Sequence, residues 1–362
     1  ADGRVDVTQA GVLEDVTLVS AELRGKGSAQ PSRTAIGLLV RGLARRFRTS
    51  GRPFTVLSCD NVMHNGQMVK KVIASFASQV EGGDTFLRWL DSAVRYPSSM
   101  VDRITPAVTA ADQAVALGLL GLVDEALVVA ETFLQWVVED DFGDSRPAWE
   151  RAGVTMTADV RPFEKAKLRV LNATHSLLAY LGQLCGYATI ADTVADDVLR
   201  GRALRMLNDD ILPTLDNLPG LDLLEYRDSV LARFANPALA HTTLQIAMDG
   251  SQKMPNRILV TALERLSAGS VPQELAFAVA AWITFIASTL SEGGPQLDDP
   301  MAAELGAAVR SADALDIEPD AVVERAFALR GIFPAELASS HEFRDAVIAQ
   351  FSEVRRVTAS LR

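Results

Sequence analysis

The hydrophobic pattern of this 362-residue chain changes at about Arg161. Before this residue, helix-like segments alternate with short apolar runs that read as strands, namely Val16–Ala21, Pro53–Cys59 and Glu131–Asp140. Strands that alternate with helices in this way are typical of a largely parallel sheet covered by helices. We therefore expect residues 1–160 to form an α/β domain.

After Arg161 the strand-like runs stop, and we expect a mainly α-helical domain over residues 161–362. Amphipathic segments with helical periodicity follow one another to the C-terminus: Phe163–Gln183, Ala191–Leu212, Leu223–Phe234, Arg257–Ser267, Leu275–Leu290 and Pro334–Val357. Leu275–Leu290 is the most apolar of them, but it is shorter than the roughly 20 residues of a membrane span. We expect it to be a buried helix. The first residues lack the layout of a secretory signal.

Composition narrows the class of protein. There are 35 Lys and Arg against 46 Asp and Glu, and no basic patch with interleaved aromatic residues, so we do not expect a nucleic-acid partner. Two distant cysteines, Cys59 and Cys185, suit a reducing cytoplasm. The four histidines lack the spacing of a zinc site, which favours chemistry without a metal. The oligomeric state stays open.

The segment Glu164–Gly182 carries Lys167, Asn172 and His175 within an otherwise apolar helix. At about 100° per residue, a regular helix places Asn172 about 140° from Lys167, with His175 between them at about 80°. One side of the helix then presents a proton acceptor and two hydrogen-bonding groups, which suits alcohol–ketone chemistry. The alternative is that these polar residues form only the solvated side of the helix.

Three further polar segments are candidates for a binding site. Asn61 follows a predicted strand, where α/β folds bind ligands, although an Asx-turn explains it as well. Asp102 and Arg103 lie in a short apolar segment between prolines and could form a surface salt bridge. Lys253 follows the turn Asp249–Ser251 and could simply face solvent.

Five motifs occur in one order along the chain: TVLSCDN…NG, YPSSMVDRITP, QWVVEDDF…RPAWERAGV, KLRVLNATHS and DGSQK. Their order and spacing resemble the long-chain polyol dehydrogenases, the family of mannitol dehydrogenase and fructuronate reductase. The resemblance covers almost the whole chain from about Thr17. It implies a Rossmann-type domain, a helical substrate domain, a site where the two meet, and NAD or NADP as cofactor.

The resemblance also implies roles for the residues that carry out the reaction. Lys167 matches the general base that takes the hydroxyl proton as hydride leaves carbon. Because a free lysine is protonated at pH 7, this role requires desolvation of the amine. Asn61 and Asn172 match the pair that holds the reacting oxygen, and Glu164 matches a carboxylate that relays protons to and from the lysine.

The substrate-binding residues implied by the resemblance are His175, Asp102 and Lys253, which match groups that bind the hydroxyls of an open-chain sugar. This chain has Gln245 at a position where some mannitol enzymes carry an arginine that contacts the substrate. A carboxylate-bearing substrate needs a cationic contact, which Arg257, Arg103 or His241 could provide. Which polyol or uronate is used therefore stays open.

A second departure concerns the cofactor half-site. Family members usually begin with a Gly-rich dinucleotide turn, and nothing of that kind precedes Val16. We interpret the partial match at Gly25–Gln30 as a loop. Either further residues precede this sequence, or the α/β domain is incomplete at its N-terminus. No cofactor-binding residue can be assigned, and the residue that separates NAD from NADP is not identified.

Three functions follow from these observations. The leading one is metal-independent, NAD(P)-dependent interconversion of a mannitol- or arabinitol-like polyol and its 2-ketose. The second is a hexuronate reductase acting on fructuronate and mannonate or on tagaturonate and altronate. The third, from another class, is a non-catalytic sugar-binding remnant, which the missing dinucleotide turn favours and the intact Lys167, Asn172, His175 and Asn61 oppose.

Overall fold

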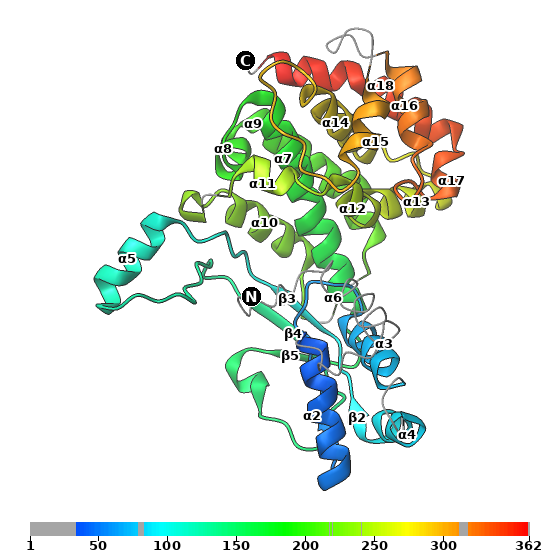
Figure 1. Ribbon diagram of the computed structural model, residues 1–362. Helices are drawn as coiled ribbons and strands as arrows, with labels where there is room; N and C mark the ends of the chain where they lie inside the picture. Colours follow the sequence, from blue (N-terminus) through cyan, green and yellow to red (C-terminus); the bar gives the residue numbers. More distant parts are fainter. Residues whose placement is uncertain are drawn as a thin grey trace. The chain divides into compact units, whose positions relative to one another are not determined.

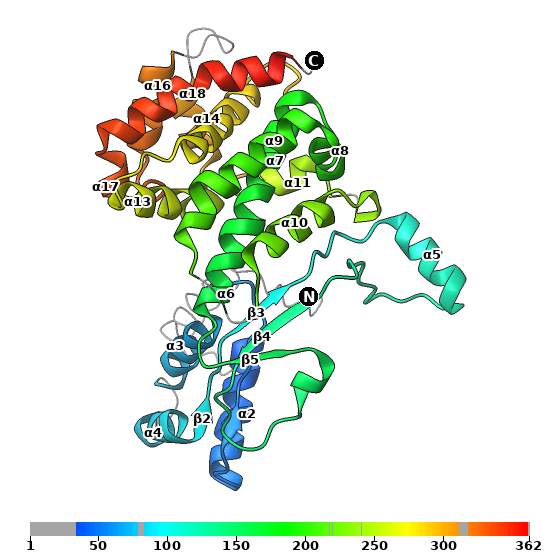
Figure 2. The same ribbon diagram turned by 180° about the vertical axis from the view of Figure 1, so that it is seen from behind.

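The computed structural model describes residues 34–78, 83–216, 218, 220–239, 241–310 and 318–360. The expected strand Val16–Ala21 and the expected loop Gly25–Gln30 lie outside these residues. The chain forms two compact units. The first unit contains the chain up to Arg103 together with Thr132–Glu164, and the second contains Ile104–Glu131 together with Lys165–Arg362. Figures 1 and 2 show the elements from two sides.

The first unit alternates helices and strands as expected. Its described elements are α2 (Ala35–Thr49), β1 (Phe54–Thr55), α3 (Asn65–Ala77), α4 (Gly83–Ala93), β2 (Val94–Arg95), β3 (Ser99–Asp102), β4 (Gln135–Glu139), a short 3-10 helix (Trp149–Ala152) and β5 (Thr155–Thr157). It ends within α6 (Arg161–Ala166). β1 pairs with β2 and β4 pairs with β5 in parallel, whereas β3 and β4 are antiparallel.

The described strands are shorter than expected, and their pairing is parallel for β1 with β2 and for β4 with β5 but antiparallel for β3 with β4. The predicted strand Pro53–Cys59 pairs over Phe54–Thr55, and in the turn that follows the Ser58 hydroxyl donates a hydrogen bond to the Asp60 carboxylate. The predicted strand Glu131–Asp140 is confined to Gln135–Glu139. β3 and β4 are antiparallel, and the segment Ile104–Glu131 between them belongs to the second unit.

The helices of the first unit pack through apolar faces. Val40, Leu43 and Ala44 recur at helical spacing along α2 and are buried with Ile73 of α3 and Leu90 of α4. Thr34 caps helix α2, and its hydroxyl accepts a hydrogen bond from the Gly37 amide at 3.0 Å.

The second unit is helical, as expected, and in its described part the only β-type pairings are isolated bridges. Its main helices are α7 (Ala173–Cys185), α8 (Ile190–Ala195), α9 (Asp197–Arg205), α10 (Leu223–Phe234), α11 (Thr243–Ala247), α12 (Gly250–Met254), α13 (Val260–Ser267), α14 (Gln273–Ser288), α15 (Ala302–Val309), α16 (Pro319–Phe327), α17 (Ala335–Ala338) and α18 (His341–Ala359). Three π-helical segments, η2 (Lys167–Asn172), η3 (Met206–Ile211) and η6 (Pro255–Leu259), interrupt them.

The most apolar predicted segment forms α14, which is buried along nearly its whole length and packs against α7 and α18. Figures 1 and 2 both show α14 beside α18. Among the helices that the structure describes, none has the length and hydropathy to cross a membrane.

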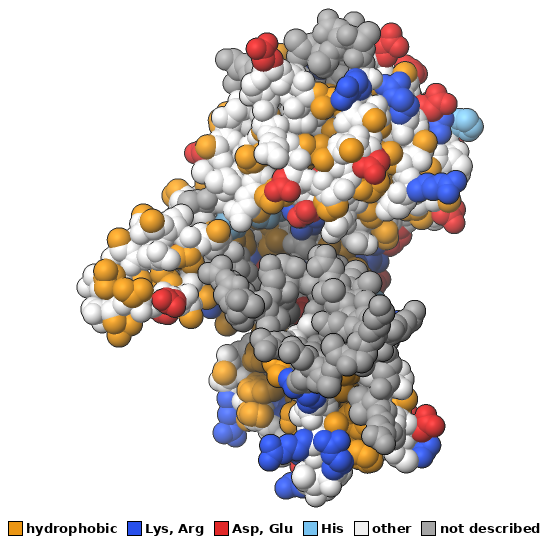
Figure 3. Space-filling view, in the orientation of Figure 1, with side chains coloured by type: hydrophobic (Ala, Val, Ile, Leu, Met, Phe, Trp, Pro, Cys, Tyr) orange, Lys and Arg blue, Asp and Glu red, His pale blue; other side chains and the backbone are white. Residues whose placement is uncertain are grey.

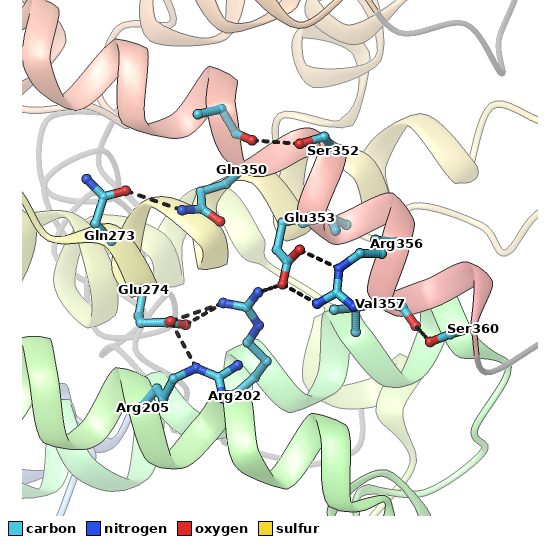
Figure 4. Close-up of polar contacts among 12 residues, drawn as sticks. Arg202, Arg205, Gln273, Glu274, Gln350, Ser352, Glu353, Arg356, Val357 and Ser360 are labelled. Carbon is cyan, nitrogen blue, oxygen red and sulfur yellow. Dashed lines mark hydrogen bonds and ion pairs between the residues drawn. The ribbon is translucent and has the colours of Figure 1, made fainter.

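Arg202 links α9 to α14 and α18 (Figure 4). Its guanidinium donates to both carboxylate oxygens of Glu274 on α14 at 3.0 Å and also pairs with Glu353 on α18. The same guanidinium lies 4.2 Å from the centre of the Phe277 ring. Buried charges are tolerated only when they are paired, and here the pairs link three helices of one unit.

The segment Ile104–Glu131 belongs to the second unit, although the sequence pattern placed it in the α/β domain. Its two ends meet, because the Glu131 carboxylate accepts a hydrogen bond from the Ile104 amide at 2.6 Å. The same carboxylate binds Arg233 of α10 through two hydrogen bonds of 2.9 and 2.7 Å. This long-range pair attaches the segment to the helical unit.

Between these ends lies α5 (Ala110–Leu120), which begins with a capping box formed by Thr109 and Asp112. The helix and its flanks leave several apolar side chains exposed, among them Leu119, which is 81% exposed. Figure 3 shows this concentration of hydrophobic side chains over α5.

Candidate functional site

The structure places three of the predicted site residues in the first unit. Asn61 is an exposed residue in the turn that follows β1, and Asp102 is the buried last residue of β3. Glu164 is buried on α6. The other four, Lys167, Asn172, His175 and Lys253, belong to the second unit and are described after them.

Asn65 holds the turn bearing Asn61 against the strand bearing Asp102. Its side-chain amide donates to the carbonyl oxygens of Asp60 at 3.0 Å and Ser99 at 2.8 Å, and its side-chain oxygen accepts from the Ser99 amide at 2.9 Å. The Ser99 hydroxyl adds a bond of 2.6 Å to the Ser58 carbonyl. These contacts bring the two motifs together within the first unit.

Glu164 receives its contacts from the start of α3. The backbone amide of His64 donates to Glu164 Oε1 at 3.1 Å, and His64 Nδ1 lies 3.7 Å from Glu164 Oε2. Burial raises the pKa of Glu164, whereas the His64 amide and imidazole act in the opposite direction. A carboxyl group in this setting accepts a proton more readily than an exposed one.

Lys167 and Asn172 mark the two ends of the π-helical segment η2, where the sequence predicts a regular α-helix. In a π-helix the backbone bonds join residues five apart, as from the Ala173 amide to the Leu168 carbonyl. Residues 167 and 172 are therefore about one turn apart and face similar directions, rather than the roughly 140° apart expected for an α-helix. π-Helical segments often occur at functional sites.

Arg257 braces this segment from η6. Its Nη1 donates to the carbonyl oxygen of Asn172 at 3.2 Å and to the Ser176 hydroxyl at 3.0 Å. On another side, Glu264 of α13 accepts hydrogen bonds from Lys165 at 3.0 Å and from Arg169 at 2.5 Å. Side chains from two neighbouring elements thus set the position of η2.

His175 is buried on α7 between two rings. Its imidazole stacks on Phe234 with ring centres 4.7 Å apart, and the His241 ring centre lies 5.4 Å away. Burial and neighbouring positive charges lower the pKa of His175 well below its ordinary value, so the ring is neutral at pH 7. Its Nε2 has no hydrogen-bond partner among the described residues, which leaves a buried polar atom for a ligand to satisfy.

Lys253 follows the turn that the sequence predicts at Asp249–Ser251. Asp249 has a left-handed backbone with φ of 55°, and a Cβ at Gly250 would lie 2.4 Å from Trp282 Nε1, so only glycine fits there. The Lys253 ammonium donates to the Ile246 carbonyl at 3.3 Å. Burial, and next the charge of Arg257, lower the pKa of Lys253 to about 8.

The sequence did not single out four residues that shape these surroundings. His64 and Asn65 lie inside the SCDN…NG motif, but only the contacts with Glu164 and Ser99 reveal their roles. Glu131 and Arg233 are 102 positions apart, and no local pattern connects them. In the part of the chain that the structure describes, no cluster of three or more His, Cys, Asp or Glu could hold a metal ion.

Two family models match the chain. The mannitol dehydrogenase Rossmann domain matches residues 2–151, and the mannitol dehydrogenase C-terminal domain matches residues 159–355. These matches confirm the predicted fold class, a Rossmann-type domain followed by a mainly helical one.

Individual relatives agree with these models. D-mannonate oxidoreductase from Escherichia coli is 39% identical over 89% of this chain and 65% of its own length. Mannitol 2-dehydrogenase from Pyrenophora tritici-repentis is 38% identical over 80% of this chain and 51% of its own length. The chain thus spans between half and two thirds of the length of these two relatives.

The same likeness appears among solved structures. The Pseudomonas fluorescens mannitol 2-dehydrogenase, solved as a ternary complex with NAD and D-mannitol, has a TM-score of 0.77 and 32% identity, covering 97% of this chain and 68% of that one. Family models, sequence relatives and fold all agree with the resemblance found in the motifs. This chain belongs to the mannitol dehydrogenase family.

Proposed function

We propose that this protein is a nicotinamide-dependent oxidoreductase that interconverts an open-chain polyol, of the mannitol or arabinitol type, and its 2-ketose. The observation that carries the proposal is the placement of Lys167, Asn172 and His175 along η2 and α7, with a buried His175 Nε2 that has no hydrogen-bond partner among the described residues. The relative from P. fluorescens, whose structure holds NAD and D-mannitol, supports the same chemistry. We place the reaction in the cytoplasm, which the free thiols of Cys59 and Cys185 suit.

In this proposal, Lys167 removes the hydroxyl proton during oxidation and returns it during reduction. The side-chain amides of Asn61 and Asn172 donate hydrogen bonds to the oxygen as negative charge develops on it. The hydrogen bond from Arg257 to the backbone carbonyl of Asn172 holds the main chain that carries the second of these amides. Glu164 exchanges the proton with Lys167, which follows it by three residues on one continuous helix.

The cofactor, NAD or NADP, supplies the hydride acceptor for this reaction. The described residues fit a dinucleotide in one respect: β1 and β2 are parallel, and dinucleotides bind beyond the carboxyl ends of parallel strands. The turn Ser58–Asn61 follows that end of β1. We assign no individual cofactor-binding residue, and the assay described below separates NAD from NADP.

The substrate-binding part of the proposal rests on His175, Asp102 and Lys253. A neutral imidazole can both donate to and accept from a hydroxyl group, and a buried carboxylate accepts from hydroxyls. The Lys253 ammonium donates hydrogen bonds and adds positive charge. Each of these groups can therefore bind a hydroxyl of an open-chain sugar alcohol.

The pKa of Lys253 leads to a prediction about pH. The ammonium is protonated below about pH 8 and loses its charge as the pH rises through that value. We expect the Kd of the ketose to be constant below pH 7 and to rise by about tenfold per pH unit well above pH 8, as measured by titration calorimetry. Replacing Lys253 with Met should weaken binding at pH 7 and abolish this dependence.

The matched control for this prediction is Lys165→Met, which removes a lysine that is bound to Glu264 instead. This variant should keep the pH dependence of the wild type. An unchanged pH profile in Lys253→Met would contradict a role for Lys253 in substrate binding.

A hexuronate reductase is the second candidate, and one observation favours it. Arg257 lies close enough to Lys253 for its positive charge to lower the pKa of the Lys253 amine. Two neighbouring cations beside His175 are a suitable environment for a substrate carboxylate. The relative named D-mannonate oxidoreductase is consistent with such a substrate.

The test is a substrate panel followed by absorbance of the reduced nicotinamide, with NADH and NADPH each offered against fructose, xylulose, fructuronate and tagaturonate. Turnover of a neutral ketose would support the polyol proposal and identify the cofactor. Turnover of the acids alone would assign the protein as a uronate reductase. Binding of these sugars without any turnover would contradict both and support the sugar-binding remnant.

A further inference from the structure

We propose, resting on the function proposed above, that the imidazole of His64 carries protons between Glu164 and bulk solvent. Glu164 then serves as the inner group of the relay and His64 as its outer group. Both residues belong to the first unit, and their geometry is therefore defined within one compact body.

The first argument is the difference in exposure along a short path. The side chain of Glu164 is 6% exposed, whereas that of His64 is 41% exposed, and 3.7 Å separates His64 Nδ1 from Glu164 Oε2. A small rotation of the imidazole brings these atoms to hydrogen-bond distance, as commonly happens when catalytic contacts tighten in a complex. A buried carboxylate thus has a titratable, solvent-facing neighbour.

The second argument is the backbone of His64. This residue precedes α3 with φ of 54°, a left-handed conformation that costs free energy for any residue other than glycine. Its side chain makes no capping hydrogen bond to the helix, so capping does not explain the histidine. The strained conformation places the backbone amide on Glu164 Oε1 at 3.1 Å and turns the ring toward the same carboxylate.

The third argument is the charge around Glu164. Besides His64, the acidic groups of Glu139 on β4 and of Asp159 act on it and, after burial, raise its pKa further. Asp159 is itself paired with Arg161 at 2.6 Å, and Glu139 accepts hydrogen bonds from the backbone amides of Ser98 and Val160. Of these neighbours, His64 is the one with a ring nitrogen, Nδ1, 3.7 Å from the Glu164 carboxylate, and an imidazole can both accept and donate a proton.

The proton balance is simple. During alcohol oxidation, protonated Glu164 transfers its proton from Oε2 to Nδ1 of neutral His64, and the imidazolium releases the proton on Nε2 to solvent. A ring rotation or tautomer exchange then restores the starting state. During ketone reduction the same steps run in reverse, and no oxidant or other reactant takes part.

The experiment separates the imidazole from the backbone amide. Asparagine tolerates a left-handed backbone and keeps the amide that holds Glu164, so His64→Asn removes only the titratable ring. Proton release into weakly buffered solution is followed with a pH indicator during a single turnover, beside the absorbance of the reduced cofactor. In His64→Asn we expect proton release to lag behind hydride transfer and to be about tenfold slower than in the wild type. This factor is smaller than the one expected for loss of a direct general base.

Added imidazole should restore the rate of proton release in His64→Asn. A second variant, His64→Gly, also fits the left-handed backbone and should behave in the same way, which guards against a folding defect in either one. His341→Asn, which removes an exposed histidine at the start of α18, is the matched control and should release protons at the wild-type rate.

Wild-type proton release in both His64 variants would overturn the relay. That outcome is distinct from a failure of the proposed function, which is tested by Lys167→Ala. If Lys167→Ala is inactive while the His64 variants release protons normally, only the role of His64 is wrong. If Lys167→Ala turns over normally, the proposed mechanism itself fails.

Discussion

We expect kcat to fall by a factor of about 10² to 10⁴ when Lys167 is replaced with alanine, because this range is typical for the loss of a general acid–base group. Binding of the ketose should stay measurable, since His175, Lys253 and Asp102 are unchanged. The measurement is steady-state kinetics with the substrate identified in the panel, together with calorimetric binding. Added methylamine should restore part of the activity of this variant by replacing the missing amine.

The matched control is Lys165→Ala, two residues earlier on the same helix. The Lys165 amine forms an ion pair with Glu264 at 3.0 Å and has no role in the proposed chemistry. Its replacement should change kcat by less than about threefold, since an exposed ion pair contributes little. Turnover of Lys167→Ala similar to that of this control would refute the lysine mechanism.

The second large effect that we expect is a loss of stability when the buried pair of Glu131 and Arg233 is broken. Replacing Glu131 with alanine leaves the buried guanidinium of Arg233 without its two hydrogen bonds and removes the acceptor of the Ile104 amide. Breaking a buried pair by deleting one partner typically costs about 3–5 kcal/mol in the free energy of unfolding. Urea unfolding followed by circular dichroism would measure this loss.

Two further variants test whether the loss of stability comes from the buried charge left without its partner. The double variant Glu131→Leu with Arg233→Met removes both charges and should recover most of the stability, because an apolar pair can replace a buried ion pair. Asp228→Ala, which removes an exposed ion pair on the same helix as Arg233, should leave the unfolding midpoint unchanged. A Glu131→Ala variant as stable as Asp228→Ala would show that the pair does not hold Ile104–Glu131 in the second unit.

Several elements could be predicted because their causes are local. The caps at Thr34 and Thr109 depend on contacts between residues three apart, and both are present. The buried helix α14 follows from an apolar run of suitable length. The tight turn before Lys253 follows from Asp249, because aspartate is one of the few residues besides glycine that adopt a left-handed backbone.

Other features could not be predicted because their causes are contacts between distant parts of the chain. The π-helical segment that places Lys167 and Asn172 about one turn apart has no clear local pattern, and Arg257, 85 residues from Asn172, braces it. The turn after β1 is held by the hydrogen bond from the Ser99 hydroxyl of β3 to the Ser58 carbonyl, which joins residues 41 positions apart. The assignment of Ile104–Glu131 to the helical unit depends on Arg233.

By itself, the sequence determined the family, the order of an α/β unit and a helical unit, and the chemical groups available to the site. These properties depend on hydrophobic period and on motif spacing, which the chain carries along its length. Only the tertiary structure decided the direction in which Lys167 and Asn172 face, the neutral state of the buried His175 and the contact between His64 and Glu164. Those depend on burial and on charges brought together from distant positions, because electrostatic interactions act through space rather than along the chain.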